Sequence, residues 1–79
     1  MRILVKATMA YLSITINEIP HLFFSLKEFQ GFQSWLEGNE KYVIMYYFTN
    51  RTKIKTEYNS KEKFEFILNE LKTYYEELA

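Results

Sequence analysis

Apolar side chains recur along this chain at regular spacings, and the spacings predict its elements. Two segments that begin 35 positions apart share a serine followed by apolar residues at i, i+3 and i+7: Ser25, Phe29, Phe32, Leu36 and Ser60, Phe64, Ile67, Leu71. This spacing predicts a helix start and one apolar helical face. A β-rich segment with a turn signal precedes each, so we expect two similar hairpin-plus-helix units.

The first β-rich segment changes the phase of its alternation. Apolar residues occupy odd positions up to Met9 and even positions from Leu12 to Ile16, which predicts a bulge or a break near residues 8–10. Asn17-Glu18 predicts a tight turn, and Pro20 marks residues 21–24 as an edge strand. With this turn, Ile14 faces His21. The alternative takes residues 2–16 as one long strand and residues 20–24 as a loop.

Local signals place the two helices. Ser25 and Glu28 form a capping box, and Gly38-Asn39 ends a helix that runs to about Glu37. Asn59-Ser60 starts the second helix. Its apolar stripe consists of Phe64, Ile67, Leu68, Leu71, Tyr75 and Leu78.

The second hairpin consists of strands 42–49 and 52–58, joined by Asn50-Arg51 as a two-residue loop. That loop pairs Tyr47 with Ile54 and turns this face toward the helices. The opposite face then carries two aromatic rings interleaved with two lysines, namely Tyr46, Phe48, Lys53 and Lys55.

These elements give an α+β fold of order ββαββα, with a mostly antiparallel four-stranded sheet and both helices on one face. If the first segment is one strand, the order is βαββα. The length of 79 residues indicates a single domain over residues 1–79.

Composition removes several classes of site. The chain has no Cys and one His, so we expect neither disulfides nor a Cys/His metal site, and no cofactor. Its longest apolar run, residues 42–48, is too short to cross a membrane. Lys6 and Thr8 interrupt the apolar N-terminal stretch, so no secretion signal forms. We expect a soluble, cytoplasmic protein.

Catalytic signals are also missing. His21 is the only imidazole, and no nucleophile or orienting carboxylate stands at a recognisable spacing from it. Only two glycines occur, so there is no glycine-rich phosphate loop. We therefore expect no enzymatic activity and no catalytic residues.

Three interpretations compete for the face that carries Tyr46 and Phe48. The lysine stems cover the rings, or the face binds another protein or a second copy of this chain. In the third, bases stack on the rings while Lys53 and Lys55 bind phosphates. Residues 41–63 hold six basic and two acidic side chains, although the whole chain has no net charge.

Two further side chains are secondary candidates for binding. Phe66 lies opposite the apolar stripe of the last helix, and Tyr74 is expected to reach solvent or a partner. The sequence thus favours a small non-enzymatic protein-interaction module, an inhibitor or adaptor of the kind found in phages and mobile elements, that occludes a partner's surface. Its partner-binding residues would be Tyr46, Phe48, Lys53, Lys55, Phe66 and Tyr74. The alternative is a nucleic-acid-binding module that uses the same aromatic and lysine face.

Overall fold

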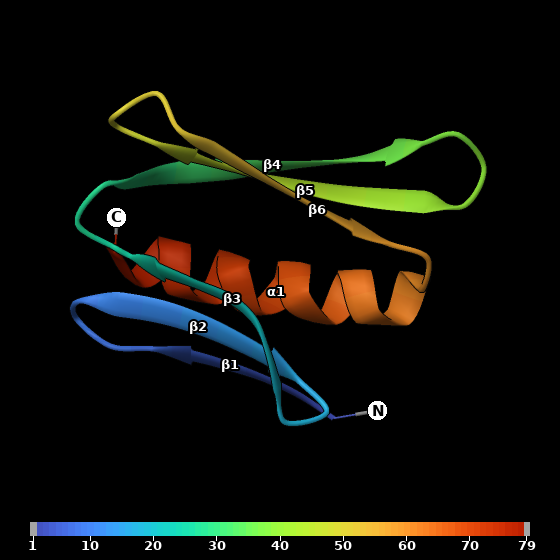
Figure 1. Cartoon of the computed structure of the whole chain (residues 1–79), viewed down its shortest axis with the longest axis horizontal. Coiled ribbons are helices and arrows are strands. Elements are labelled where there is room, and N and C mark those ends of the chain that lie inside the picture. Colours follow the sequence, from blue (N-terminus) through green and yellow to red (C-terminus); the bar gives the residue numbers. More distant parts are fainter. Residues whose placement is uncertain (1, 79) are drawn as a thin grey trace.

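The computed structural model describes residues 2–78, with the side chains of 2–74. The described residues form six strands and one helix: β1 (Ile3–Ala7), β2 (Tyr11–Ile16), β3 (Ile19–Ser25), β4 (Phe29–Glu37), β5 (Lys41–Phe48), β6 (Lys53–Tyr58) and α1 (Lys61–Leu78). Strands β1-β2-β3 form antiparallel sheet A, and β4-β5-β6 form antiparallel sheet B. Figure 1 shows α1 lying between the two sheets.

The predicted fold class is wrong. Neither ββαββα nor βαββα describes the chain, because the described strands form two three-stranded sheets instead of one four-stranded sheet. The segment predicted as the first helix is strand β4. The predicted second helix is confirmed as α1.

A bulge in β4 explains why its sequence resembles a helix. Phe29 pairs with Phe48 and Gly31 pairs with Tyr47, so Gln30 is an extra residue in the ladder. The extra residue brings Phe29 and Phe32 to the same face of the sheet. Leu36 shares this face because it lies four positions beyond Phe32. The helix-like spacing therefore comes from a bulged strand.

The two serines that start the matching segments have different roles. Ser60 Oγ accepts a hydrogen bond from the Lys63 N–H at 3.2 Å, which caps the first turn of α1. Ser25 Oγ accepts from the Lys27 N–H at 3.3 Å, within a turn that leads into β4. The predicted stripe of α1 is partly visible: Ile67 and Leu71 are buried. The side chains of Tyr75 and Leu78 lie outside the described ones.

The phase change predicted a bulge or a break near residues 8–10, and the structure has a break there, so residues 3–25 form three strands where the predicted order has at most two. The Thr8 hydroxyl accepts hydrogen bonds from the N–H groups of Ala10 and Tyr11 and stabilises the turn between β1 and β2. The predicted tight turn is confirmed: Asn17 and Glu18 have φ of 52° and 68°, and the flanking Ile16 and Ile19 pair.

The predicted pairing of Ile14 with His21 is wrong. Ile14 pairs with Leu22 and Thr15 pairs with Pro20, so His21 is the extra residue of a second bulge. This bulge shifts the rest of β3 by one residue. As a result Phe24 faces the core and Phe23 faces outward.

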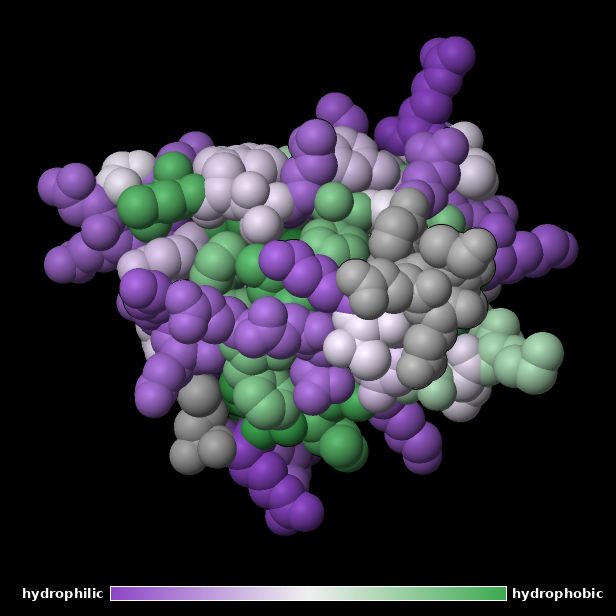
Figure 2. Space-filling model, turned by 180° about the vertical axis from the view of Figure 1, so that it is seen from behind, coloured by the Kyte–Doolittle hydropathy of each residue, from purple (hydrophilic) through white to green (hydrophobic). Residues whose placement is uncertain are grey.

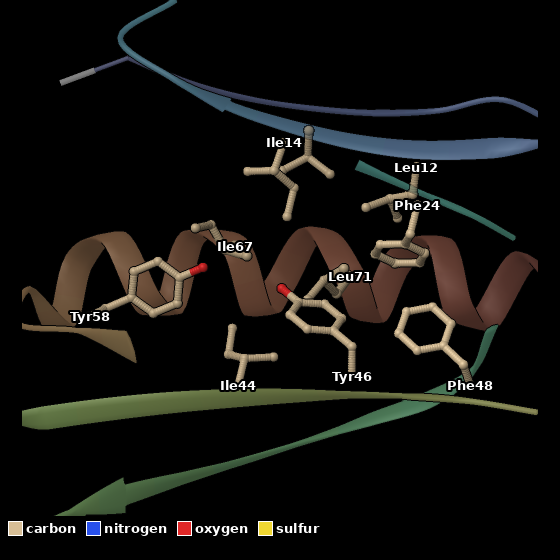
Figure 3. Close-up of a cluster of buried hydrophobic side chains, with 10 residues drawn as sticks. Leu12, Ile14, Phe24, Ile44, Tyr46, Phe48, Tyr58, Ile67 and Leu71 are labelled. Atoms are coloured by element: carbon tan, nitrogen blue, oxygen red, sulfur yellow. The ribbon is translucent and has the colours of Figure 1, made fainter. Parts of the chain in front are cut away.

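The core lies where the inner faces of both sheets meet α1. Phe24 of sheet A contacts Phe48 and Tyr46 of sheet B, with ring centroids 5.1 and 5.6 Å apart. Figure 3 shows Ile67 and Leu71 of α1 beside these rings. The helix packs against β1, β5 and β6 and so fills the space between the sheets.

Candidate functional site

The two aromatic anchors predicted from the sequence are core residues. Tyr46 is 0% exposed and Phe48 is 8% exposed, and both project toward α1 and sheet A (Figure 3). A partner cannot reach either ring without unfolding the protein. Tyr46 and Phe48 therefore do not form a contact surface.

The register of the second hairpin causes this reversal. Tyr46 pairs with Ile54 and Tyr47 pairs with Lys53, one residue away from the predicted pairing. The loop has three residues, because the Phe48 N–H donates to the Thr52 carbonyl and Arg51 adopts a left-handed φ of 68°. A one-residue shift moves every side chain of a strand to the opposite face.

The outer face of sheet B is consequently built from other residues. Val43, Met45 and Tyr47 of β5 project there, beside Trp35 of β4. Val43 is 0% exposed, so this face already has an apolar layer beneath its charged side chains. The Tyr47 hydroxyl donates to Gln33 Oε1 at 2.7 Å, which fixes the ring along the sheet.

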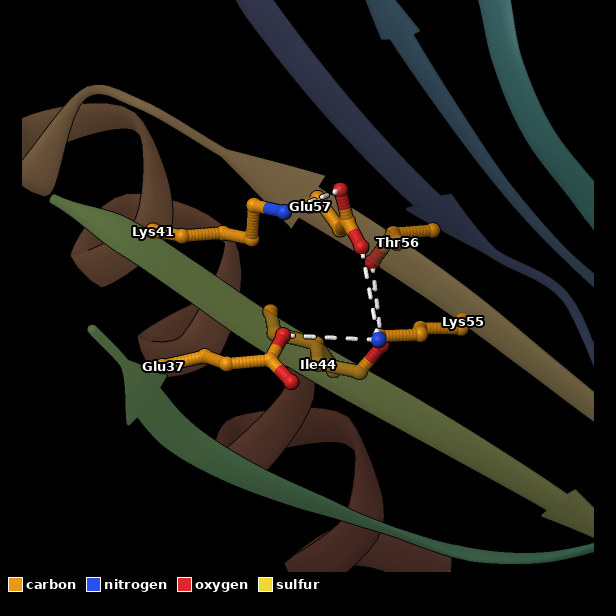
Figure 4. A network of polar contacts seen from close by, with 6 residues as sticks. All are labelled: Glu37, Lys41, Ile44, Lys55, Thr56 and Glu57. Carbon is orange, nitrogen blue, oxygen red and sulfur yellow. Dashed lines mark hydrogen bonds and ion pairs between the residues drawn. The ribbon is translucent and has the colours of Figure 1, made fainter.

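The two predicted binding lysines lie on this outer face and bind groups of their own chain. Lys53 Nζ lies 5.8 Å from the centre of the Tyr47 ring. Lys55 Nζ lies 3.4 Å from carboxylate oxygens of both Glu37 and Glu57 (Figure 4). These contacts raise the pKa of Lys55, and the hydrogen bond with Glu57 has a larger effect than the one with Glu37. Lys41 adds a 3.5 Å pair to Glu57.

This network makes the outer face of sheet B a covered surface. Lys53 lies over the Tyr47 ring, and ion pairs join Lys41 and Lys55 to Glu57 and Glu37 across this face. The sequence interpretation in which lysine stems cover Tyr46 and Phe48 is wrong, because those two rings lie in the core. Three lysines and two glutamates leave this face one unit of positive charge.

The two secondary candidates, Tyr74 and Phe66, differ in their exposure and contacts. The Tyr74 hydroxyl donates to the Val5 carbonyl oxygen at 3.2 Å, so Tyr74 joins α1 to β1 instead of reaching solvent. Phe66 is 44% exposed and borders a surface hollow with Arg2, Ile3 and Glu62. On the side of the molecule shown in Figure 2, hydrophobic side chains are exposed between projecting hydrophilic ones and form no single broad patch.

The outer face of sheet A is the apolar surface that remains open. It is defined here by Leu4, Lys6, Tyr11, Ser13, Thr15 and Phe23, which share one side of three neighbouring strands. Phe23 is 64% exposed and Leu4 is 58% exposed. The Tyr11 and Phe23 rings stack at 5.1 Å with an 18° angle between their planes.

Sequence reasoning missed this surface for a definite reason. The alternation of β1 and β2 already placed Leu4 and Tyr11 on the strand faces opposite the apolar Val5 and Leu12. Phe23, however, faces outward only because of the bulge at His21. The stacked pair therefore became visible only with the observed register.

His21 occupies a site of its own. The bulge directs its ring across to sheet B, where Nε2 lies 2.8 Å from the Tyr58 hydroxyl. Partial burial, and secondly the charge of Lys63, lower the pKa of His21. The described residues include no group of three or more His, Cys, Asp or Glu side chains that could hold a metal.

Comparisons with protein-family models, curated proteins and solved structures find no match for this chain. Within residues 2–78, no helix combines the length and apolarity that crossing a membrane requires.

Proposed function

We propose that this chain is a small protein-interaction module, an inhibitor or adaptor, that binds a partner protein through the outer face of sheet A and occludes the surface it covers. The exposed Tyr11–Phe23 stack carries this proposal. The proposed role is binding and involves no catalysis.

Aromatic pairs of this kind are well suited to anchor a partner. Each ring offers a large apolar area, and such residues dominate the binding energy of many interfaces. Here both rings project from paired strands, and each restrains the other by stacking at 5.1 Å. Binding therefore loses little conformational entropy at these positions.

Lys6 indicates the chemistry of the partner. It lies beside Ser13 on the outer face of sheet A and forms no ion pair with a described acidic residue. A partner surface with apolar groups facing Phe23 and a carboxylate facing Lys6 is complementary to this arrangement. Contact of a rim charge mainly orients the partner, while the rings supply the affinity.

A nucleic acid fits this surface less well. Phosphate binding needs several cations, and the outer face of sheet A offers Lys6 alone. Lys55 on the other outer face is already paired with Glu37 and Glu57. Nucleic-acid binding is therefore the competing outcome, and a steep linear fall of log affinity with log salt would reveal it.

The test compares two exposed phenylalanines. The wild-type protein, immobilised, captures candidate partners from a lysate of the source organism, and the affinity of each purified candidate is then measured by calorimetry. We expect Phe23→Ser to weaken binding at least about 30-fold, a loss typical of an interface anchor. Phe66→Ser is the matched control, and it should bind like wild type.

Folding must be monitored in both variants by circular dichroism and thermal melting. Because Phe23 and Phe66 are both exposed, neither change should unfold the protein. Equal affinity of Phe23→Ser, Tyr11→Ser and the wild type for a partner would contradict the proposal. A loss confined to Phe66→Ser would move the binding site to α1.

A further inference from the structure

Three of the four edge strands carry features that discourage pairing with another strand. On β1, the Val5 carbonyl accepts the hydrogen bond from Tyr74. On β3, Pro20 lacks an N–H and His21 is bulged. Strand β6 carries a charged side chain at every second position, namely Lys53, Lys55 and Glu57.

Strand β4 has none of these features over most of its length. At nine residues it is the longest described strand, and it contains neither lysine nor proline. It pairs with β5 on one side only. Within the described part of the chain, the backbone of residues 33–37 makes no hydrogen bond outside the ladder with β5. An edge of this kind is a template for another strand.

We propose that β4 pairs antiparallel with β4 of a second copy of this chain. The pairing joins the two copies of sheet B into one six-stranded sheet, with the two-fold axis at Ser34. A two-fold axis of this kind closes the assembly at two copies. This inference does not depend on the proposed function, because the outer face of sheet A stays free.

The bulge determines the register of this pairing. Beyond Gln30 the strand is uninterrupted from Gly31 to Glu37, a stretch centred on Ser34. Pairing about Ser34 places Phe32 of one copy opposite Leu36 of the other. Leu36 is 54% exposed in the single chain, and this apolar cross-strand pair covers it.

Charge selects the antiparallel direction. Glu37 is the only charged residue between Gly31 and Glu37. Antiparallel pairing about Ser34 holds the two Glu37 residues about 20 Å apart, at roughly 3.4 Å per residue. Parallel pairing in register would place the two carboxylates side by side, which is destabilising.

The first test compares two leucines of similar exposure on edge strands of different sheets. We expect the wild-type protein to have about twice the chain mass of 9.6 kDa by light scattering or sedimentation. Leu36→Lys should give the single-chain mass, because it replaces the apolar pair with Phe32 by a charged lysine on the pairing edge. Leu4→Lys, on the outer face of sheet A, should remain a dimer.

Each alternative result is informative. A wild-type protein that stays monomeric at high micromolar concentration overturns the proposal, and so does a dimer that survives Leu36→Lys. Dissociation by Leu4→Lys alone would assign self-association to the outer face of sheet A. That result would also show the second copy to be the partner under the proposed function.

The second test reads the register directly. The chain has no Cys, so each introduced thiol is unique. Residues opposite each other across an antiparallel pair lie about 4.5–5.5 Å apart, within disulfide reach. We expect Ser34→Cys to form a covalent dimer on mild oxidation and Glu37→Cys to remain largely uncrosslinked. Parallel pairing in register would crosslink both variants, so efficient crosslinking of Glu37→Cys would contradict the antiparallel arrangement.

Discussion

His21 Nε2 lies 2.8 Å from the Tyr58 hydroxyl, and this contact joins the edge of sheet A to sheet B. Among the described side chains it is the hydrogen bond that crosses between the sheets. The two rings are also in contact, with centroids 5.5 Å apart. A bulge, a single histidine and a buried tyrosine thus restrain how the two sheets pack.

The first prediction concerns the pH dependence of stability. Partial burial and the charge of Lys63 lower the pKa of His21 below its ordinary value of 6.5. The unfolded chain therefore binds this proton more tightly than the folded chain does. The free energy of unfolding should be constant above about pH 6.5 and decrease as pH falls through that value toward the folded pKa.

Melting temperatures between about pH 8 and pH 5.5 test this, because His21 is the only imidazole. His21→Gln should remove the slope in this window. An unchanged slope in His21→Gln would show that other groups cause it.

The second prediction concerns the hydroxyl of Tyr46. This oxygen is buried and makes no well-formed hydrogen bond with a described residue, although the hydroxyls of Tyr58 and Thr56 lie near it. The neighbouring Thr56 hydroxyl instead donates to the Ile44 carbonyl at 3.1 Å. Burial raises the pKa of Tyr46 far above its ordinary value, so the phenol stays neutral. Tyr46→Phe should therefore raise the free energy of unfolding by about 1 kcal/mol.

Tyr46→Ser provides the contrast in the same urea titration. It removes a ring from the core and should lower the free energy of unfolding by about 3–5 kcal/mol. A Tyr46→Ser protein as stable as the wild type would contradict the inward placement of this ring.

The third prediction concerns the turn between β2 and β3. Glu18 has a φ of 68°, which is strained for a residue with a side chain. Glu18→Gly should stabilise the protein by up to about 1 kcal/mol, because Asn-Gly suits this turn.

The control is Glu18→Ala, measured by thermal melting under the same conditions. It loses the same exposed ion pair to Arg2 and keeps the strain, so it should be no more stable than wild type. Equal stabilisation by both changes would attribute the effect to the lost charge.

The fourth prediction concerns the apolar layer on the outer face of sheet B. Val43 is fully buried there, outside the main core and beside Trp35. Val43→Ala should lower the free energy of unfolding by about 2 kcal/mol in a urea titration. Met9→Ala, at a fully exposed turn, should change it by less than about 0.5 kcal/mol. Similar values for the two variants would mean that the charged network does not protect Val43.

Local signals predicted several elements correctly. The Ser60 cap and the apolar periodicity that follows specify α1, because both act within one or two helical turns. Asn17-Glu18 specifies its tight turn for the same reason. In contrast, the segment from Phe29 to Leu36 has a helical pattern but forms a strand, because it pairs with β5.

The candidate site was predicted less well, and a single residue accounts for most of the error. A two-residue loop at Asn50-Arg51 and the observed loop of three residues differ by one step of register. Because of that step, Tyr47 lies on the outer face, where Tyr46 and Phe48 were predicted. The bulge at His21 made the corresponding exchange of Phe24 for Phe23 in sheet A.

By itself, the sequence determined where most chain segments turn, where the helix begins, and that the chain carries neither cysteine nor more than one histidine. Only the tertiary structure decided which aromatic rings are buried and which are open to a partner. The physical reason is that strand faces alternate at every residue, so one bulged or looped residue reverses them. Whether such a residue is inserted depends on pairing with distant strands, which a local pattern does not contain.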